Sequence, residues 1–285
     1  MQTLNLINSE KGNIKYSISR FPDGEVQITV GEFSRKDIVE VNCRITNAEE
    51  LFILMQVADI LSRHEVEWHL NIYYLMGMRM DRVMDFNRPF SLKIIGGVIR
   101  NLGAKRIALL EPHSDVSYEV VGGQYDSINP ANDLYMDLHP NSLRVFNNYL
   151  VVYPDAGAYD RYGWSNRQVV RAEKVRDIST GKIESIRIVN PETLSESNLP
   201  IIVVDDLCDG GGTFVGLAKE IRKYTDKELN IFVTHMVNPK GIENLAKMYD
   251  HVYFTNSYKD WNTFKAEYGK VVPFLPENVT QIDVV

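Results

Sequence analysis

The sequence predicts an α/β protein with two domains, each a mainly parallel sheet flanked by helices. Apolar runs of strand length alternate with helical patterns along the chain, which is typical of βαβ units. The run at 201–204 holds four β-branched residues, as expected for a strand buried on both faces. The length of 285 residues exceeds the usual size of one core. We expect a boundary near residue 138, which gives domains at 1–138 and 139–285.

The first half of the chain has the elements of one such domain. In chain order we expect strands at 4–7, 14–18, 70–75 and 106–112, and helices at 48–63 and 90–101. The first helix is expected to place one apolar stripe against the sheet, formed by Leu51, Leu54, Met55, Ala58 and Leu61. The second helix ends near Gly103, a residue type common just after a helix.

The second half repeats this alternation. We expect helices at 134–147, 214–224 and 242–248, strands at 149–155, 201–204 and 230–235, and a charged loop at 171–177. In open parallel sheets, ligands bind at the carboxyl ends of the strands. The candidate site residues all lie at such ends.

Composition excludes several classes of protein. The net charge of −7 argues against broad binding of nucleic acid, which needs a basic surface. The longest apolar runs are far shorter than the ~20 residues of a membrane helix, and the first residues lack the pattern of a secretion signal. Cys43 and Cys208 lie far apart, without the spacing of metal ligands, which suits a reducing compartment. We therefore expect a cytoplasmic protein without nucleic-acid or membrane partners.

The segment at 201–213, IIVVDDLCDGGGT, joins a buried strand, paired acids and a glycine-rich loop ahead of a helix. Glycines let the backbone approach an anion, and the N–H groups at a helix N-terminus favour negative charge. Asp205 and Asp206 suit ribose hydroxyls or a hydrated divalent cation. The alternative is a flexible turn beside two solvated acids. The flanking strand and helix favour a site for a phosphorylated sugar.

Other candidate segments also follow strands or turns. FPDGE at 21–25 has the residues of a tight turn. EPHSD at 111–115 flanks an imidazole with carboxylates, which suits a divalent cation, although a histidine at a strand end is often structural. RAEKVRD at 171–177 is either a solvated charged loop or a source of two cations, spaced K-x-R, for a migrating phosphoryl group.

These segments, in chain order from residue 21 to about 241, resemble the motifs of ribose-phosphate pyrophosphokinases. The loop at 201–213 resembles the phosphoribosyl diphosphate motif that this family shares with phosphoribosyltransferases. YLMGMRMDR at 74–82 and YPDAGAYDR at 153–161 resemble two further family loops. THMVNPKG at 234–241 resembles a third, in which His235 is expected either to be structural or to support the residues that contact the ligand. The resemblance implies two phosphoribosyltransferase-type domains with ATP and a ribose 5-phosphate group meeting at their interface, Mg²⁺ as the cofactor, and a homo-oligomer.

The resemblance also implies roles for individual residues. ATP would be bound by Phe21, Asp23, Glu25, Arg79, Asp81 and Arg82. Mg²⁺ would be held by His113 and Asp155, and the migrating diphosphate would face the backbone of Ala156 and Gly157. Lys174 and Arg176 would be the catalytic cations of a mobile loop. The ribose phosphate would be bound by Asp205, Asp206, Asp209, Gly210, Gly211, Gly212 and Thr213.

The activity implied is transfer of the β,γ-diphosphate of Mg-ATP to the 1-hydroxyl of ribose 5-phosphate, which serves nucleotide biosynthesis. Two departures from the family pattern matter. Gly210 stands where the family has a hydroxyl, so an alternative acceptor is a ribose 5-phosphate ester such as ADP-ribose, in NAD-related metabolism. Only residues 8–13 separate the first two strands, where the family has a whole helix, so we expect a shortened N-terminus and an altered assembly. A non-catalytic regulatory homologue that binds a synthetase is a further alternative.

Overall fold

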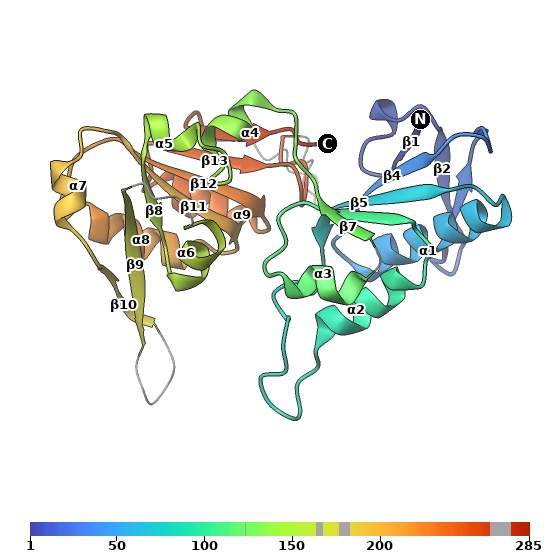
Figure 1. Cartoon of the computed structure of the whole chain (residues 1–285), viewed down its shortest axis with the longest axis horizontal. Helices are drawn as coiled ribbons and strands as arrows, with labels where there is room; N and C mark the ends of the chain where they lie inside the picture. The colour runs from blue at the N-terminus through green and yellow to red at the C-terminus, as the bar shows by residue number, and fades with distance from the viewer. Residues whose placement is uncertain (123, 164–167, 177–182, 263–274) are drawn as a thin grey trace. The chain divides into compact units, whose positions relative to one another are not determined.

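The chain divides into two compact units in its computed structural model, which describes residues 1–122, 124–163, 168–176, 183–262 and 275–285. The first unit is Met1–Asn129 with Val285, and the second is Pro130–Val284 (Figure 1). The division lies before the expected boundary at 138, because helix α4 (Asp133–Leu138) belongs to the second unit. Tyr135 of α4 packs edge-on against Phe232, with ring centroids 5.8 Å apart.

The first unit contains a five-stranded parallel sheet in the order β1-β4-β5-β6-β7. Its strands are β1 (Gln2–Asn5), β4 (Val39–Ile45), β5 (Trp68–Leu75), β6 (Arg106–Leu109) and β7 (Gln124–Ser127). Its helices are α1 (Ala48–Arg63), α2 (Ser91–Arg100) and α3 (Val116–Val121), with a 3-10 turn η1 (Ser9–Lys11). Gly96 lets α2 and α3 approach closely, since a Cβ there would lie 2.6 Å from Val120 Cγ2.

A separate antiparallel hairpin joins β2 (Tyr16–Arg20) to β3 (Val26–Val30) in the first unit. Gly24 adopts a φ of 96° at its tip, a conformation that glycine reaches without strain. The Phe21 N–H donates to the Glu25 carbonyl at 2.8 Å and closes the turn. The tight turn expected from Pro22, Asp23 and Gly24 is therefore confirmed.

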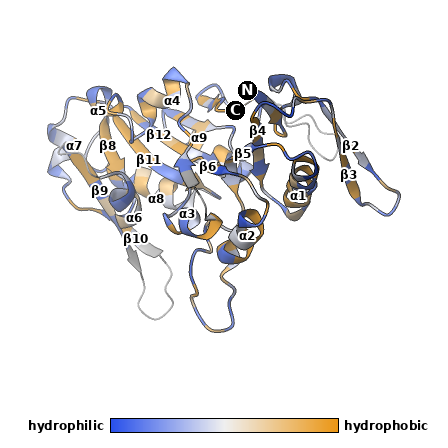
Figure 2. Ribbon diagram, turned by 45° about the vertical axis from the view of Figure 1, so that its right-hand side comes forward, coloured by the Kyte–Doolittle hydropathy of each residue, from blue (hydrophilic) through white to orange (hydrophobic). Residues whose placement is uncertain are grey.

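The second unit is built on a seven-stranded sheet in the order β10-β9-β8-β11-β12-β13-β14. The strands are β8 (Leu150–Tyr153), β9 (Val169–Arg176), β10 (Ile183–Ile188), β11 (Ile201–Cys208), β12 (Leu229–Met236), β13 (His251–Thr255) and β14 (Val279–Ile282). The helices are α4, α5 (Val145–Asn148), α6 (Ala156–Tyr162), α7 (Glu192–Glu196), α8 (Gly212–Ile221) and α9 (Pro239–Ala246). Among the described strands of this sheet, only β10 runs antiparallel to its neighbour. Figure 2 shows β8, β11 and β12 largely in the hydrophobic colour, as expected of strands covered on both faces.

The predicted α/β fold with mainly parallel sheets is confirmed. The helix expected at 48–63 has the bounds of α1, and Asn47 caps it by accepting from the Glu50 N–H. The helix expected at 134–147 is instead two short helices, α4 and α5. His139 is extended, with ψ of 131°, because Pro140 disfavours helical geometry in the residue before it. In the described part of the chain, no helix is long and apolar enough to cross a membrane.

Candidate active site

The glycine-rich loop lies where the sequence pattern places it, between strand β11 and helix α8. Asp205 and Asp206 fall near the carboxyl end of β11, and α8 begins at Gly212. Gly211 caps the helix with φ of 78°, a left-handed conformation that explains glycine at this position. The loop therefore presents a helix N-terminus, a favourable place for a phosphate.

Helix α9 holds this loop in place. The Asn244 Nδ2 donates to the Gly210 carbonyl at 2.8 Å, and the Asn238 Nδ2 donates to Asp209 Oδ1 at 3.0 Å. Gly241 makes the contact possible, since a Cβ at that position would lie 2.1 Å from the Asp209 carbonyl oxygen. By contrast, a Cβ at Gly210 would meet no described atom within 4 Å. One side of the loop is thus fixed and the side at Gly210 is open.

The paired acids bind an arginine that sequence analysis did not single out. Arg161 Nη1 lies 2.7 Å from Asp206 Oδ1 and 3.6 Å from Asp205 Oδ1. Asp206 is 2% exposed. Burial and the adjacent Asp206 carboxylate raise the pKa of Asp205 well above its usual range, although Arg161 acts in the opposite direction. Burial lowers the pKa of Arg161, but Asp206, Tyr162 and Asp205 outweigh it and the pKa rises.

Asp155 and Lys174 form an ion pair in the same unit, with Oδ2 and Nζ 2.5 Å apart. Asp155 also caps helix α6, because its Oδ1 accepts from the Ala158 N–H at 3.0 Å. Burial raises the pKa of Asp155, but the Lys174 and Ala158 hydrogen bonds outweigh it, so the net pKa is lowered. Ala156 and Gly157 form the exposed first turn of α6. Asp155, the predicted metal ligand, is thus ionised and forms an ion pair with Lys174, the predicted catalytic cation.

The segment expected to be a charged loop at 171–177 is largely strand β9, paired antiparallel with β10. Alternation explains this difference: Val170 and Ala172 are fully buried on one face, and Lys174 follows them on that face. The many charges hide this period of two in the sequence. The side chain of Arg176, at the end of β9, and the whole of Asp177 lie outside the described residues.

Cys208 and His235 are buried within this unit. Burial, with Asp205 and Asp209 nearby, raises the pKa of Cys208 to about 12, so the side chain stays a neutral thiol rather than a reactive thiolate. His235 is 0% exposed and its Nδ1 is 2.8 Å from Ser257 Oγ. These contacts fit the structural role expected for His235.

Three ATP-site candidates of the first unit, Phe21, Asp23 and Glu25, lie on one turn and are exposed. Phe21 is 50% exposed at the start of the β2–β3 turn. Asp23 Oδ1 accepts from the Glu25 N–H at 3.1 Å. Asp23 and Glu25 therefore stabilise the turn that carries Phe21.

Two motif loops of the first unit meet at Asp81. This carboxylate is 6% exposed and accepts two hydrogen bonds from Arg82, at 2.9 and 3.2 Å. The pKa of Asp81 is lowered, mainly by Arg82 and further by Ser114 and His113, while burial opposes the shift. Loop 79–82, in which Arg79 is exposed, thus lies beside the segment that contains the predicted metal ligand His113.

Each unit contains one predicted magnesium ligand, and each ligand has a donor atom that suits a magnesium ion held largely by phosphates. His113 is half-buried in the first unit, and Asp155 offers an ionised carboxylate in the second. Within the described ranges, no three His, Cys, Asp or Glu side chains cluster as a complete metal site. Mg²⁺ is usually bound through one or two carboxylates together with substrate phosphates, so such a cluster is not required.

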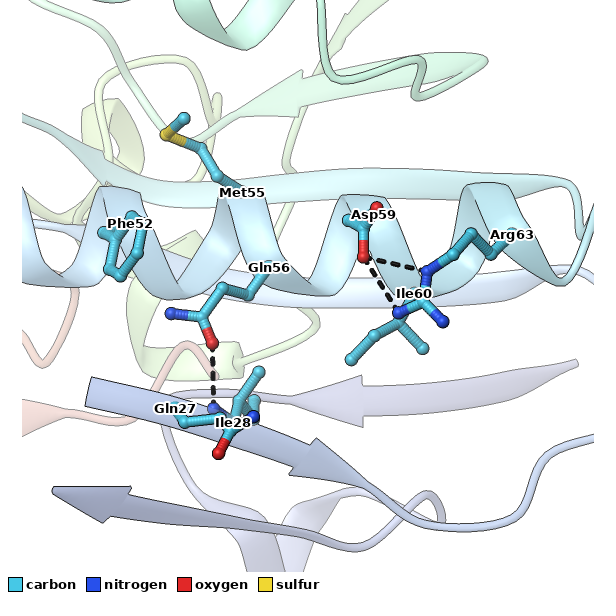
Figure 3. A pocket seen from close by; sticks show the side chains of 8 residues that line it. All are labelled: Gln27, Ile28, Phe52, Met55, Gln56, Asp59, Ile60 and Arg63. Atoms are coloured by element: carbon cyan, nitrogen blue, oxygen red, sulfur yellow. Dashed lines mark hydrogen bonds and ion pairs between the residues drawn. The ribbon is translucent and has the colours of Figure 1, made fainter. Parts of the chain in front are cut away.

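A groove of about 360 Å³ lies on the first unit between β3 and α1 (Figure 3). Phe52 and Met55 line it, 47% and 41% exposed, and Gln56 connects its walls by accepting from the Ile28 N–H at 3.0 Å. The residues drawn around this groove include none of the predicted site residues. It is a separate feature of the first unit.

The chain is similar over most of its length to several curated proteins that share one name. It is 26% identical over 258 residues to the ribose-phosphate pyrophosphokinase of Pyrococcus abyssi, covering 87% of this chain and 86% of that one. It is 27% identical over 260 residues to the enzyme of the same name from Helicobacter hepaticus, covering 85% and 79%. The fold resembles that of phosphoribosylpyrophosphate synthetase from Mycobacterium smegmatis, with a TM-score of 0.70, 18% identity, and 97% and 88% of the chains covered. No family model matches the sequence.

Proposed function

We propose, from the premise that this chain is a divergent relative of the ribose-phosphate pyrophosphokinases, that it transfers the β,γ-diphosphate of Mg-ATP to the 1-hydroxyl of a ribose 5-phosphate group. The observation that carries the proposal is the charge cluster of the second unit. Lys174 is paired with Asp155 at the start of helix α6, and Arg161 in the last turn of this helix is paired with Asp206 beside the glycine-rich loop. A cation, a carboxylate ligand and a sugar-phosphate loop thus interact within one unit.

In the proposed reaction, the 1-hydroxyl oxygen of the sugar forms a bond to the β-phosphorus of ATP. The bond from that phosphorus to the oxygen bridging to the α-phosphorus breaks, so AMP leaves with this oxygen, and the hydroxyl proton passes to water. Lys174 stabilises the negative charge of the migrating diphosphate, since such transfers depend on charge stabilisation and alignment. Asp205 accepts hydrogen bonds from the sugar hydroxyls, and Gly210–Thr213 bind the 5-phosphate with backbone N–H groups.

His113 of the first unit and Asp155 of the second would each serve as a ligand for Mg²⁺. When bound, Mg²⁺ supplies neutralisation of the phosphate oxygens. Phe21 would stack on the adenine, and the exposed Arg79 would contact the phosphates through its guanidinium fork. These assignments follow the family resemblance and the strand-end or turn positions of the residues.

The open side of the loop at Gly210 favours a second candidate acceptor. A hydrogen bond to a charged group contributes about 1.5–3 kcal/mol, and Gly210 lacks the hydroxyl that would donate one to a phosphate dianion. A 5-phosphate that carries a further substituent has less charge than the dianion and needs space for that substituent, and a Cβ at Gly210 has nothing described within 4 Å. An ester such as ADP-ribose fits both features.

The experiment that tests the proposal measures AMP release from Mg-ATP with ribose 5-phosphate and ADP-ribose side by side. Gly210→Thr restores a hydroxyl at a position where φ is not left-handed and space is free. We expect this variant to shift the preference toward ribose 5-phosphate by about tenfold or more. Gly97→Thr, at another open position, is the matched control and should leave the preference unchanged.

The outcomes separate the candidates. Wild-type turnover of ribose 5-phosphate alone supports an ordinary synthetase, and preference for ADP-ribose supports the ester. No AMP with either acceptor would contradict the proposed activity and favour a non-catalytic homologue that binds a synthetase.

A further inference from the structure

The contact between Arg161 and the paired acids is unusual in its burial. The Arg161 side chain is 21% exposed, and the Asp206 side chain that it contacts at 2.7 Å is 3% exposed. Removing charges from water is costly, and one partner left alone in such a pair is strongly destabilising. The cost of placing a largely covered arginine against the buried Asp206 therefore suggests that this ion pair has a role in the proposed site.

The two acids are not equivalent with respect to Arg161. Asp205 lies farther from the guanidinium, at 3.6 Å, and its side chain is 16% exposed. Asp205 Oδ1 accepts from the Asp206 N–H at 2.9 Å, so the position of one acid is tied to the backbone of the other. Arg161 thus fixes the Asp206 carboxylate, and the Asp206 backbone N–H orients the Asp205 carboxylate.

Helix α6 connects this contact with the other end of the site. Asp155 caps the start of the helix, and Arg161 lies in its last turn. The Arg161 guanidinium also lies over the Tyr162 ring, 5.4 Å from its centroid, which restricts the rotation of the side chain. A single short helix therefore carries both the carboxylate paired with Lys174 and the cation paired with Asp206.

We propose that Arg161 is a positioning residue for the acceptor sugar: through its ion pair with Asp206 it holds Asp205 in the orientation that receives the sugar hydroxyls. This role rests on the proposed function. Arg161 contacts the acids rather than the reacting atoms, so its loss should weaken acceptor binding more than ATP binding.

The test is steady-state kinetics of AMP release for Arg161→Gln and Arg161→Lys, with the better acceptor of the wild-type chain. For Arg161→Gln we expect KM for the acceptor to rise about tenfold or more, with KM for ATP changed by less than about twofold. Arg161→Lys keeps the charge and should recover part of the loss. Arg222→Gln is the matched control, because Arg222 pairs with Asp250 at 2.8 Å elsewhere in the same unit. This control should leave both KM values unchanged.

A double variant keeps the test valid if Arg161→Gln folds poorly. Arg161→Gln with Asp206→Asn removes both charges, so we expect thermal stability to recover while KM for the acceptor stays raised. Intact folding with an unchanged acceptor KM in these variants would overturn the role of Arg161 while leaving the proposed function intact. A wild-type chain that releases no AMP with either acceptor would overturn both.

Discussion

Several candidate residues of the second unit are built into buried contacts, whereas several of those of the first unit lie at the surface. Asp206 is 2% exposed and bound to Arg161, while Phe21 is 50% exposed at the tip of a hairpin. Side chains held by neighbours keep their geometry without a ligand, and exposed side chains gain theirs from the ligand. We therefore expect substitutions in the second unit to change chemistry and stability together, and those at exposed positions of the first unit to change ATP affinity alone.

The largest effect should come from Lys174. Lys174→Ala removes the cation paired with Asp155, and we expect kcat for AMP release to fall by about 100-fold or more, as when one stabilising donor is lost. Lys219→Ala, at an exposed lysine of α8, is the control and should retain full activity. Equal activity of the two variants would remove Lys174 from the proposed mechanism.

A second large effect should follow from the contact between α9 and the glycine-rich loop. Gly241→Ala places a Cβ 2.1 Å from the Asp209 carbonyl oxygen, so the loop must move, and we expect a loss of about 1–3 kcal/mol in the free energy of unfolding. Denaturant unfolding followed by circular dichroism measures it. Gly97→Ala has open space and should be neutral or slightly stabilising. Unchanged stability in Gly241→Ala would show that the glycine-rich loop of the second unit can move without cost, and so is not held more rigidly than the exposed turn of the first unit.

The buried setting of Asp205 in the second unit should also make the stability of the protein depend on pH. The raised pKa of Asp205 means that its favourable contribution to folding is complete below its unfolded pKa of about 4 and is lost as pH rises through the folded pKa. Asp205→Asn should therefore unfold less readily than wild type at pH 7, with the difference shrinking toward pH 4. Denaturant unfolding across this range measures it, with the exposed Asp226→Asn as control. A variant less stable than wild type at pH 7 would contradict the assigned shift.

The smallest effect on stability should come from Phe21. Because Phe21 is half-exposed, Phe21→Ala should change the free energy of unfolding by less than about 0.5 kcal/mol. Loss of a stacking contact should raise KM for ATP about two- to tenfold. Phe52→Ala, equally exposed in the groove of Figure 3, is the control and should leave KM for ATP unchanged. If Phe52→Ala raised KM for ATP and Phe21→Ala did not, ATP would be placed in that groove instead.

Sequence periodicity predicted the fold class, and it predicted α1 to the residue, because buried stripes and caps are local patterns. It failed at β9, where alternating charges conceal a strand, and at 134–147, where Pro140 divides a helix. The loop at 205–213 was found because its glycines and acids are contiguous. Arg161 was not singled out, since its contact with Asp206 depends on α6 bringing it to the end of β11.

The two cysteines have a practical consequence. Cys43 lies in β4 of the first unit and Cys208 in β11 of the second, and both are buried free thiols. Burial raises the pKa of each, so neither reacts readily while its sheet is intact. The rate at which each thiol is alkylated therefore reports the opening of its own unit. Each unit thus contains one natural thiol probe of its own opening, and single Cys→Ser variants would allow the two alkylation rates to be measured separately.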